Sequence, residues 1–218
     1  VVFASVQTLH RNLDEFDAAE FDYVVVDEFH HAAASSYRKV IDHFEPAFLL
    51  GLTATPERMD GADLLGLCGD NLVYEANLVE GINRNELVPF EYHGIKDIVD
   101  FAPIPWRNGK FDPDALAEAI ETHERAAHAH REWASRAGQR TLAFCQTTAH
   151  ADFMASWFRA QGLRTASVHS HASSDPRRRS VKQLEDGELD VLFAVDIFNE
   201  GFDLPAIDTV LMLRPTDS

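Results

Sequence analysis

The chain has 218 residues, of which 45% are apolar and 25% charged, and this composition excludes a disordered or fibrous protein. No apolar run reaches the roughly 18 residues that a membrane span needs, so a membrane protein is not expected. The net charge of −17 argues against binding nucleic acid through a broad basic face, but a narrow groove lined by hydroxyls and backbone N–H groups is compatible with it.

Short apolar runs alternate with amphipathic segments along the chain, a pattern that predicts parallel α/β layers. Helices are expected over 36–44, capped by Ser35, and from Asp112-Pro113 to Gly138. A third helix should start at Thr147 or Thr148 and end at Gly162. Strands are expected at VVFASV (1–6), YVVVDE (23–28), FLLGLTA (48–54), PFEYHGI (89–95), TLAFCQ (141–146), TASVHS (165–170), LDVLFAVD (189–196) and TVLMLRP (209–215).

The middle of the chain has a different composition from its two ends. Residues 58–111 are rich in glycine and proline, which indicates that one domain closes there and a connection begins. We therefore predict a first domain over 1–93, a connection over 94–118 and a second domain over 119–218. Because the chain opens inside one expected strand and stops just after another, both domains are expected to be truncated.

Two adjacent carboxylates follow the second apolar run. Tyr23–Val26 predicts a buried strand, and Asp27 and Glu28 come directly after it, at the edge where parallel sheets bind ligands. A hydrated Mg²⁺ with phosphate oxygens suits such a pair, so Asp27 is a candidate metal ligand. Glu28 is then a candidate base for a water that attacks a γ-phosphate. A pair that merely caps the following helix explains these two residues equally well.

A second polar strand end follows about 25 residues later, in GLTATPER at 51–58. Two successive strands would place Asp27, Glu28 and His30 at the same sheet edge as Thr53 and Thr55. Hydroxyl groups there would relay hydrogen bonds between a nucleotide site and another surface. A threonine-rich turn before Pro56 accounts for this stretch when it is taken alone.

VVVDEFH followed by GLTATPER resembles the DExH branch of the superfamily 2 helicases and translocases. FASVQTLHR, TLAFCQTTAHADFMASWF and the run from VHSHASS to EGFDLPAIDTVLMLRP resemble further motifs of that family in the family order. The pattern is most similar to the restriction-subunit-like and DNA-repair-like motors. The resemblance implies an α/β chain with two RecA-like parallel-sheet motor domains in tandem.

The resemblance also implies roles for individual residues. Asp27 and Glu28 keep the Mg²⁺ and water roles, and His30 links the nucleotide site to the second domain. Thr53, Ala54 and Thr55 form the segment that couples hydrolysis to movement. The remaining positions are Glu200, Gly201 and Asp203 at the nucleotide cleft, and Gln7, Thr8, Thr147 and Thr148 for contacts to the sugar-phosphate backbone of nucleic acid.

The activity that the resemblance implies is ATP-dependent movement on nucleic acid, with ATP and Mg²⁺ as cofactors. DNA is favoured over RNA by the family branch alone, and flanking domains of the same chain are the expected partners. The Walker A loop and the QxxGRxxR segment are absent from the sequence, so the chain alone is expected to be inactive. A RecA-like nucleic-acid-binding or scaffold module without hydrolysis is the alternative.

Other signals favour structural roles. The two cysteines, Cys68 and Cys145, lack a CxxC partner and are expected to be reduced core thiols. The eleven histidines lack zinc-site spacing. His171 stands where relatives usually have glycine, so the turn there must tolerate a side chain. The absence of a signal segment favours a cytoplasmic location.

Overall fold

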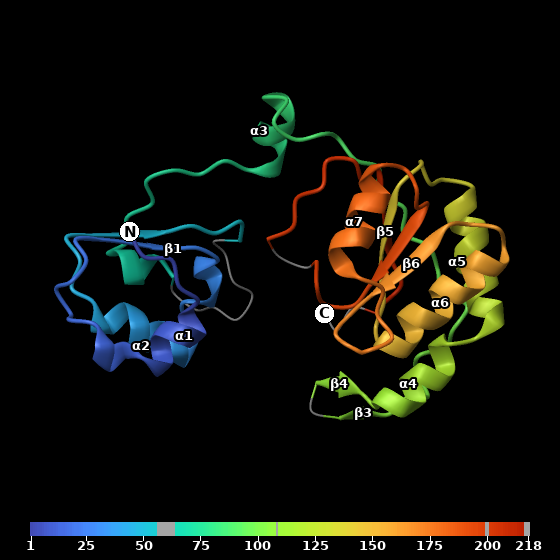
Figure 1. Ribbon diagram of the computed structural model, residues 1–218, viewed down its shortest axis with the longest axis horizontal. Helices are drawn as coiled ribbons and strands as arrows, with labels where there is room; N and C mark the ends of the chain where they lie inside the picture. Colours follow the sequence, from blue (N-terminus) through green and yellow to red (C-terminus); the bar gives the residue numbers. More distant parts are fainter. Residues whose placement is uncertain (56–63, 108, 199–200, 216–218) are drawn as a thin grey trace. The chain divides into compact units, whose positions relative to one another are not determined.

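The computed structural model describes residues 1–55, 64–107, 109–198 and 201–215 (Figure 1). These residues form two compact units, Val1–Glu91 and Tyr92–Ser218. Each unit contains a parallel sheet covered by helices, so the predicted α/β class is confirmed. The predicted connection, 94–118, falls within the second unit.

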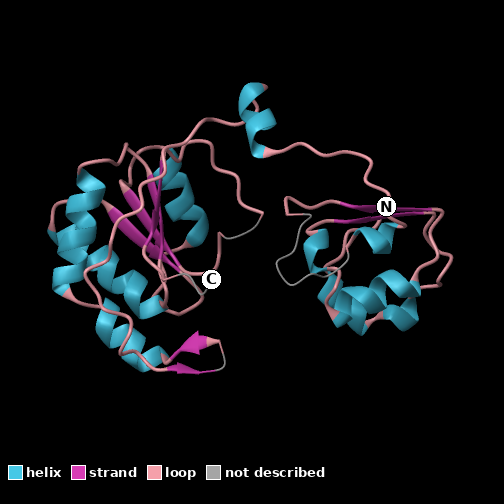
Figure 2. Ribbon diagram, turned by 180° about the vertical axis from the view of Figure 1, so that it is seen from behind, coloured by secondary structure: helices cyan, strands magenta, loops and turns pink. Residues whose placement is uncertain are grey.

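The first unit is built on two parallel strands. β1 (Tyr23–Val26) pairs with β2 (Phe48–Gly51). In both views α1 (Val6–Arg11) and α2 (Ser35–His43) lie on one face of this pair (Figures 1 and 2). Its remaining elements are α3 (Leu78–Asn83) and three short 3₁₀ turns, Leu13–Glu15, Phe29–His31 and Leu65–Cys68.

β1 is not the fully buried strand that its apolar run predicts. Val26 is buried, but Tyr23 is 68% exposed and Val25 57% exposed. Successive side chains of a strand point to opposite faces, and the helices α1 and α2 cover only one of them. The run is therefore apolar on both faces although the described residues bury only one.

Two predictions for the first unit, a strand and a helix cap, are wrong. VVFASV (1–6) forms no strand, because the Ser5 side chain accepts a hydrogen bond from the Thr8 backbone N–H and starts α1 instead. Ser35 is the first residue of α2 and not its cap, which is Ala34. The sequence pattern places a helix end only to within one or two residues. The backbone geometry of the individual residue decides whether it is the cap or the first helical residue.

The second unit contains a four-stranded parallel sheet in the order β6-β7-β5-β8. Helices cover both of its faces (Figure 2). Ala126 of α5 and Met154 and Phe158 of α6 pack in one cluster with Phe193 of the sheet, and Leu184 of α7 packs in the other cluster with Leu192. The bounds are β5 Thr141–Phe144, β6 Thr165–Val168, β7 Val191–Ala194, β8 Thr209–Met212, α4 Pro113–Ile120, α5 His123–Ala134, α6 Thr148–Ala160 and α7 Arg177–Glu185.

The single long helix predicted from Asp112 to Gly138 is two helices. Its start is confirmed, because Asp112 accepts a hydrogen bond from the Ala115 N–H and Pro113 opens α4. α4 ends at Ile120, and Thr122 starts α5 by accepting a hydrogen bond from the Arg125 N–H at 3.2 Å. Thr122 caps a new helix inside a stretch whose pattern is helical throughout, and the stretch therefore forms two helices.

The strand predicted at 89–95 is absent, and a short hairpin follows instead. β3 (Trp106–Arg107) pairs in antiparallel fashion with β4 (Lys110–Phe111). Both cysteines carry free thiols, and Cys145 is buried in the core as predicted, whereas Cys68 is only half-buried.

A buried arginine joins distant parts of the second unit. Arg125 is 5% exposed, and its guanidinium donates to the Asp97 carboxylate at 2.9 Å and to the Leu213 carbonyl oxygen at 2.8 Å. His150 Nε2 lies 3.3 Å from the same guanidinium. Burial, and then the neighbouring charge of Arg125, lower the pKa of His150 to about 3.

Replacing Gly51 with alanine should destabilise the first unit. A Cβ at this position would lie 2.5 Å from Cγ of Phe29, which is itself buried, so the β1–β2 pair must shift. Overpacking of this kind costs about 1 to 3 kcal/mol. Urea unfolding followed by circular dichroism measures it, with Gly94→Ala as the control because the nearest atom to its Cβ would be 3.6 Å away. Equal stabilities of the two variants would contradict the prediction.

Acid should destabilise the second unit through His150. The lowered pKa means that the unfolded chain binds the proton first as the pH falls below about 6.5. The stabilising contribution of neutral His150 is complete above that pH and declines by about 1.4 kcal/mol per pH unit until the folded-state pKa is reached. Unfolding free energies of the wild type and His150→Gln should therefore converge between pH 6.5 and 4. Parallel pH profiles would contradict this.

Candidate functional site

The ends of β1 and β2 are joined by two backbone hydrogen bonds beyond the strands themselves. The Leu52 N–H donates to the Val26 carbonyl at 2.9 Å, and the Phe29 N–H donates to the Leu52 carbonyl at 2.8 Å. These bonds hold residues 27–30 beside residues 52–55. The sheet edge therefore brings together the two segments that the sequence singles out.

Phe29 fixes the turn that follows β1. Its ring lies over Gly51 and is 4% exposed, so the side chain anchors the turn in the core. Glu28, just before it, has φ of 51° and ψ of 46°, the left-handed conformation that non-glycine residues rarely adopt. Such a conformation costs about 1 to 3 kcal/mol and persists where the surroundings hold it, as they do at many active sites.

The side chains at this edge form a short polar chain. His30 Nδ1 lies 3.3 Å from Glu28 Oε2 and also 3.3 Å from Thr53 Oγ1. Thr53 Oγ1 accepts a hydrogen bond from the Thr55 N–H at 3.0 Å. A carboxylate is thus connected through one imidazole to a hydroxyl and to the backbone after β2.

Asp27 is exposed at the same edge, and its Oδ1 accepts a hydrogen bond from the Glu28 N–H at 2.9 Å. Among the residues that the structure describes, no three His, Cys, Asp or Glu side chains converge on one point. One open carboxylate at a strand end suits a hydrated Mg²⁺, which keeps several waters and binds phosphate oxygens, and does not suit a metal enclosed by protein ligands.

A second candidate site lies in the second unit, at the carboxyl ends of its strands. A cavity of about 590 Å³ is lined there by Gln146 and Thr147 after β5, Asp196 after β7 and Arg214 after β8. Its remaining lining comes from Lys110 and Phe111 of β4, Pro113 and Leu116 of α4, and Pro215 after β8. The carboxyl edge of a parallel sheet is where α/β folds bind ligands.

Thr147 and Arg214 are both held in place at this cavity. The Thr147 hydroxyl caps α6 by accepting from the His150 N–H at 3.0 Å, and it donates to the Glu121 carboxylate at 3.2 Å. Arg214 Nη1 donates to Asp196 Oδ1 at 3.3 Å. Asp196, like Glu28, has a positive φ, of 55°.

The sequence analysis missed Gln146, Asp196 and Arg214 as candidates. Each lies at the end of a run that it recognised as a strand: TLAFCQ, LDVLFAVD and TVLMLRP. Like Asp27 and Glu28, each of them is a polar residue just after a strand of a parallel sheet, and this signal is present in the sequence.

The other predicted site residues have diverse surroundings. Gln7 and Thr8 lie on α1, and the Thr8 hydroxyl is 2.8 Å from that of Ser5. Thr148 opens α6, and Ala54 lies in a bend between Thr53 and Thr55.

Residues of the predicted nucleotide motif lie after β7. Gly201 has φ of +63°, and a Cβ there would meet nothing within 4 Å, so the backbone conformation is what requires glycine. Asp203 is exposed, and Glu200 lies outside the described residues. The non-glycine residues with positive φ in the described part of the chain do not include His171, so its turn tolerates a side chain without strain.

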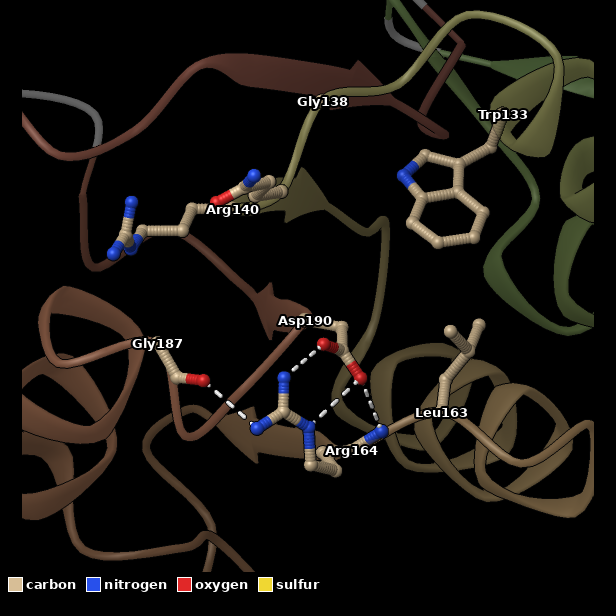
Figure 3. Close-up of a pocket in the computed structure, with 8 residues that line it drawn as sticks. Trp133, Gly138, Arg140, Leu163, Arg164, Gly187 and Asp190 are labelled. Atoms are coloured by element: carbon tan, nitrogen blue, oxygen red, sulfur yellow. Dashed lines mark hydrogen bonds and ion pairs between the residues drawn. The ribbon is translucent and has the colours of Figure 1, made fainter.

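A smaller cavity, of about 230 Å³, lies at the opposite edge of the same sheet (Figure 3). Arg164 points toward Asp190, forms an ion pair with it and donates to the Gly187 carbonyl at 2.8 Å. Hydrogen bonding to Arg164 lowers the pKa of Asp190. Arg164 comes just before β6 and Asp190 just before β7, so this ion pair joins the starts of the two strands.

Comparison with known proteins gives two family matches. Residues 1–58 match the family described as "Type III restriction enzyme, res subunit", and residues 123–218 match "Helicase conserved C-terminal domain". None of the helices in the described ranges has the length and apolar character to cross a membrane.

Similar proteins include the Saccharomyces cerevisiae protein named "Putative ATP-dependent helicase IRC3", which is 30% identical over 100% of this chain and 33% of its own length. An Escherichia coli protein, "Type I restriction enzyme EcoAI endonuclease subunit", is 35% identical over 46% of this chain and 12% of its own length. The solved Hef helicase domain of Pyrococcus furiosus is 12% identical, with a TM-score of 0.49 over 97% of this chain and 70% of that one.

The chain spans 33%, 43% and 36% of the lengths of three curated relatives that it matches along most of its own length. The two family matches fall on the two units separately, one on the Asp27–Thr55 edge and one on the four-stranded sheet. Together they identify the chain as superfamily 2 helicase-like, with a restriction-type segment followed by a helicase C-terminal domain.

Proposed function

We propose that the protein is an ATP-dependent helicase or translocase that acts on DNA, with its hydrolytic site at the carboxyl edge of β1 and β2. The observation that carries this proposal is the connection from Glu28 through His30 to Thr53, with 3.3 Å between each pair of atoms. A carboxylate that merely capped the next helix would not need this connection.

Glu28 acts as the general base in this proposal. Its carboxylate accepts the proton of a water that attacks the γ-phosphate of ATP. The exposed carboxylate of Asp27 would hold Mg²⁺, which neutralises phosphate charge when bound. Phe29 is buried against Gly51 and thereby holds the turn that carries the two carboxylates.

His30 couples the site to the second segment. Its Nδ1 lies at the same distance, 3.3 Å, from Glu28 Oε2 and from Thr53 Oγ1, and one N–H at this nitrogen can donate a strong hydrogen bond to only one of them at a time. A change of charge on Glu28 therefore changes how strongly His30 binds Thr53. Thr53 Oγ1 also accepts a hydrogen bond from the Thr55 N–H, so a change in the contact between His30 and Thr53 affects the chain after β2.

Nucleic acid is proposed to contact neutral polar groups, since the chain carries 36 acidic and 19 basic residues. The candidates are Gln7, Thr8, Thr147 and Thr148, and Glu200, Gly201 and Asp203 are proposed to serve the nucleotide. The names of relatives from restriction and from the UvrABC system support DNA as the substrate. The second candidate function is a nucleic-acid-binding module that does not hydrolyse ATP.

Replacing Glu28 with glutamine should abolish DNA-stimulated ATP hydrolysis by the full-length protein. Loss of one general base typically lowers kcat by about 10²- to 10⁴-fold. The matched control is Glu45→Gln, an exposed carboxylate of the same unit with the same change of charge. If Glu28→Gln hydrolyses ATP within twofold of the wild type, Glu28 is not the base and the second candidate function gains support.

The 218-residue chain should bind DNA weakly and with a shallow salt dependence. Few cations face the phosphates, so the logarithm of the binding constant should fall with the logarithm of salt concentration with a slope of about −3. Fluorescence anisotropy between 25 and 200 mM salt measures the slope. Nanomolar affinity with a slope near −8 would mean that a broad cationic surface exists after all.

A further inference from the structure

The hairpin of β3 and β4 has no role in the function described so far. It extends from the second unit beside α4 (Figure 1). Trp106 pairs with Phe111 and Arg107 with Lys110, and Gly109 in the turn has φ of +74°, as tight hairpin turns require. Two such short strands are not stable by themselves, so the packing at their base must hold them.

The base of the hairpin is packed firmly. The Phe111 ring packs against the cluster formed by Ile104, Leu116 and Ile120. The Asp112 N–H donates to the Pro105 carbonyl at 2.7 Å and closes the base of the hairpin. The hairpin is therefore a fixed projection of the α4 segment.

The two strands of the hairpin carry cationic and aromatic side chains. Trp106 contacts Phe111 edge to face at 4.6 Å between ring centroids, yet 48% of Trp106 stays exposed. Arg107 and Lys110 are exposed, and neither forms an ion pair with any residue that the structure describes. Open cations beside an exposed indole are unusual in a chain with a net charge of −17.

The hairpin also continues a site already described. Lys110 and Phe111 line the 590 Å³ cavity together with Thr147 and Arg214. A polyanion in this cavity would therefore meet Lys110, and the strand partners of Lys110 and Phe111 are Arg107 and Trp106. The volume is sufficient for about one nucleotide, since small-molecule sites range from roughly 300 to 1,000 Å³.

We propose that the β3–β4 hairpin binds single-stranded nucleic acid, with one base stacked on Trp106 and adjacent phosphates bound by Arg107 and Lys110. This inference rests on the proposed function, because the nucleic acid that the hairpin binds would be the one that contacts Thr147 in the cavity. Stacking on an aromatic ring tolerates any base, and charged side chains follow the backbone, so the contact is independent of sequence. An acidic peptide would use the two cations but would gain little from the indole.

The test is the affinity of the 218-residue chain for a fluorescein-labelled 15-nucleotide oligo(dT) at 25 mM salt. Trp106→Ala should weaken binding by about 5- to 100-fold, the range expected from loss of one stacked base. Trp106→Phe, which keeps a ring, should bind within about threefold of the wild type. Oligo(dT) should also quench tryptophan fluorescence in the wild type but much less in Trp106→Phe.

Two control variants separate local from general effects. Lys110→Ala should weaken binding several-fold, whereas Lys182→Ala, which removes one exposed charge from α7, should not. Tyr92→Ala removes an aromatic ring that is 86% exposed elsewhere in the second unit and should bind as the wild type does. Circular dichroism of each variant verifies that the fold is retained.

Three results would overturn the hairpin proposal. Trp106→Ala and Lys110→Ala that bind as the wild type does would exclude the hairpin while leaving the proposed function intact. Displacement of oligo(dT) by poly-glutamate at equal charge concentration would assign the surface to acidic chains. Absence of any binding to oligo(dT) would remove the site, and the Glu28→Gln measurement would still decide the proposed function by itself.

Discussion

The parallel pairing of β1 with β2 determines the rest of the first unit. Val26 and Gly51 lie opposite each other, and the ladder continues through the hydrogen bond from the Leu52 N–H to the Val26 carbonyl. Because parallel strands present their carboxyl ends at one edge, this register places His30 beside Thr53 and not one residue away. A shift of one strand by one residue would turn its side chains to the other face of the sheet and separate His30 from Thr53.

The two units have the same type of turn at their sheet edges. In each, a buried strand residue, Val26 or Ala194, is followed within two positions by an acidic residue with positive φ, Glu28 or Asp196. Each carboxylate then contacts a cationic or imidazole partner at 3.3 Å, His30 or Arg214. The left-handed turn reverses the chain sharply, so the carboxylate stays at the edge while the next apolar side chain returns to the core. For Glu28 that side chain is Phe29.

Much of the fold could be predicted from the sequence, and the site in part. Apolar runs identify β1, β2 and β5 to β8 because burial requires them, and polar residues directly after a strand identify Asp27, Glu28 and Thr53. The sequence analysis predicted a strand at 1–6, where α1 begins, and merged α4 with α5, because one capping hydrogen bond, accepted by Ser5 or by Thr122, decides each boundary. Contacts between distant residues, such as Arg125 with Asp97 and Leu213, leave no periodic signal. The roles of the individual site residues stay predictions.

A double-mutant cycle measures whether His30 transmits the charge state of Glu28 to Thr53. DNA-stimulated kcat of the full-length protein would be measured for the wild type, His30→Ala, Thr53→Val and the double variant. Residues that act through one contact should show a coupling energy of about 1 to 3 kcal/mol, so the double variant should be barely slower than the worse single variant. Effects that add within about 0.3 kcal/mol would contradict the account, because His30 and Thr53 would then act independently.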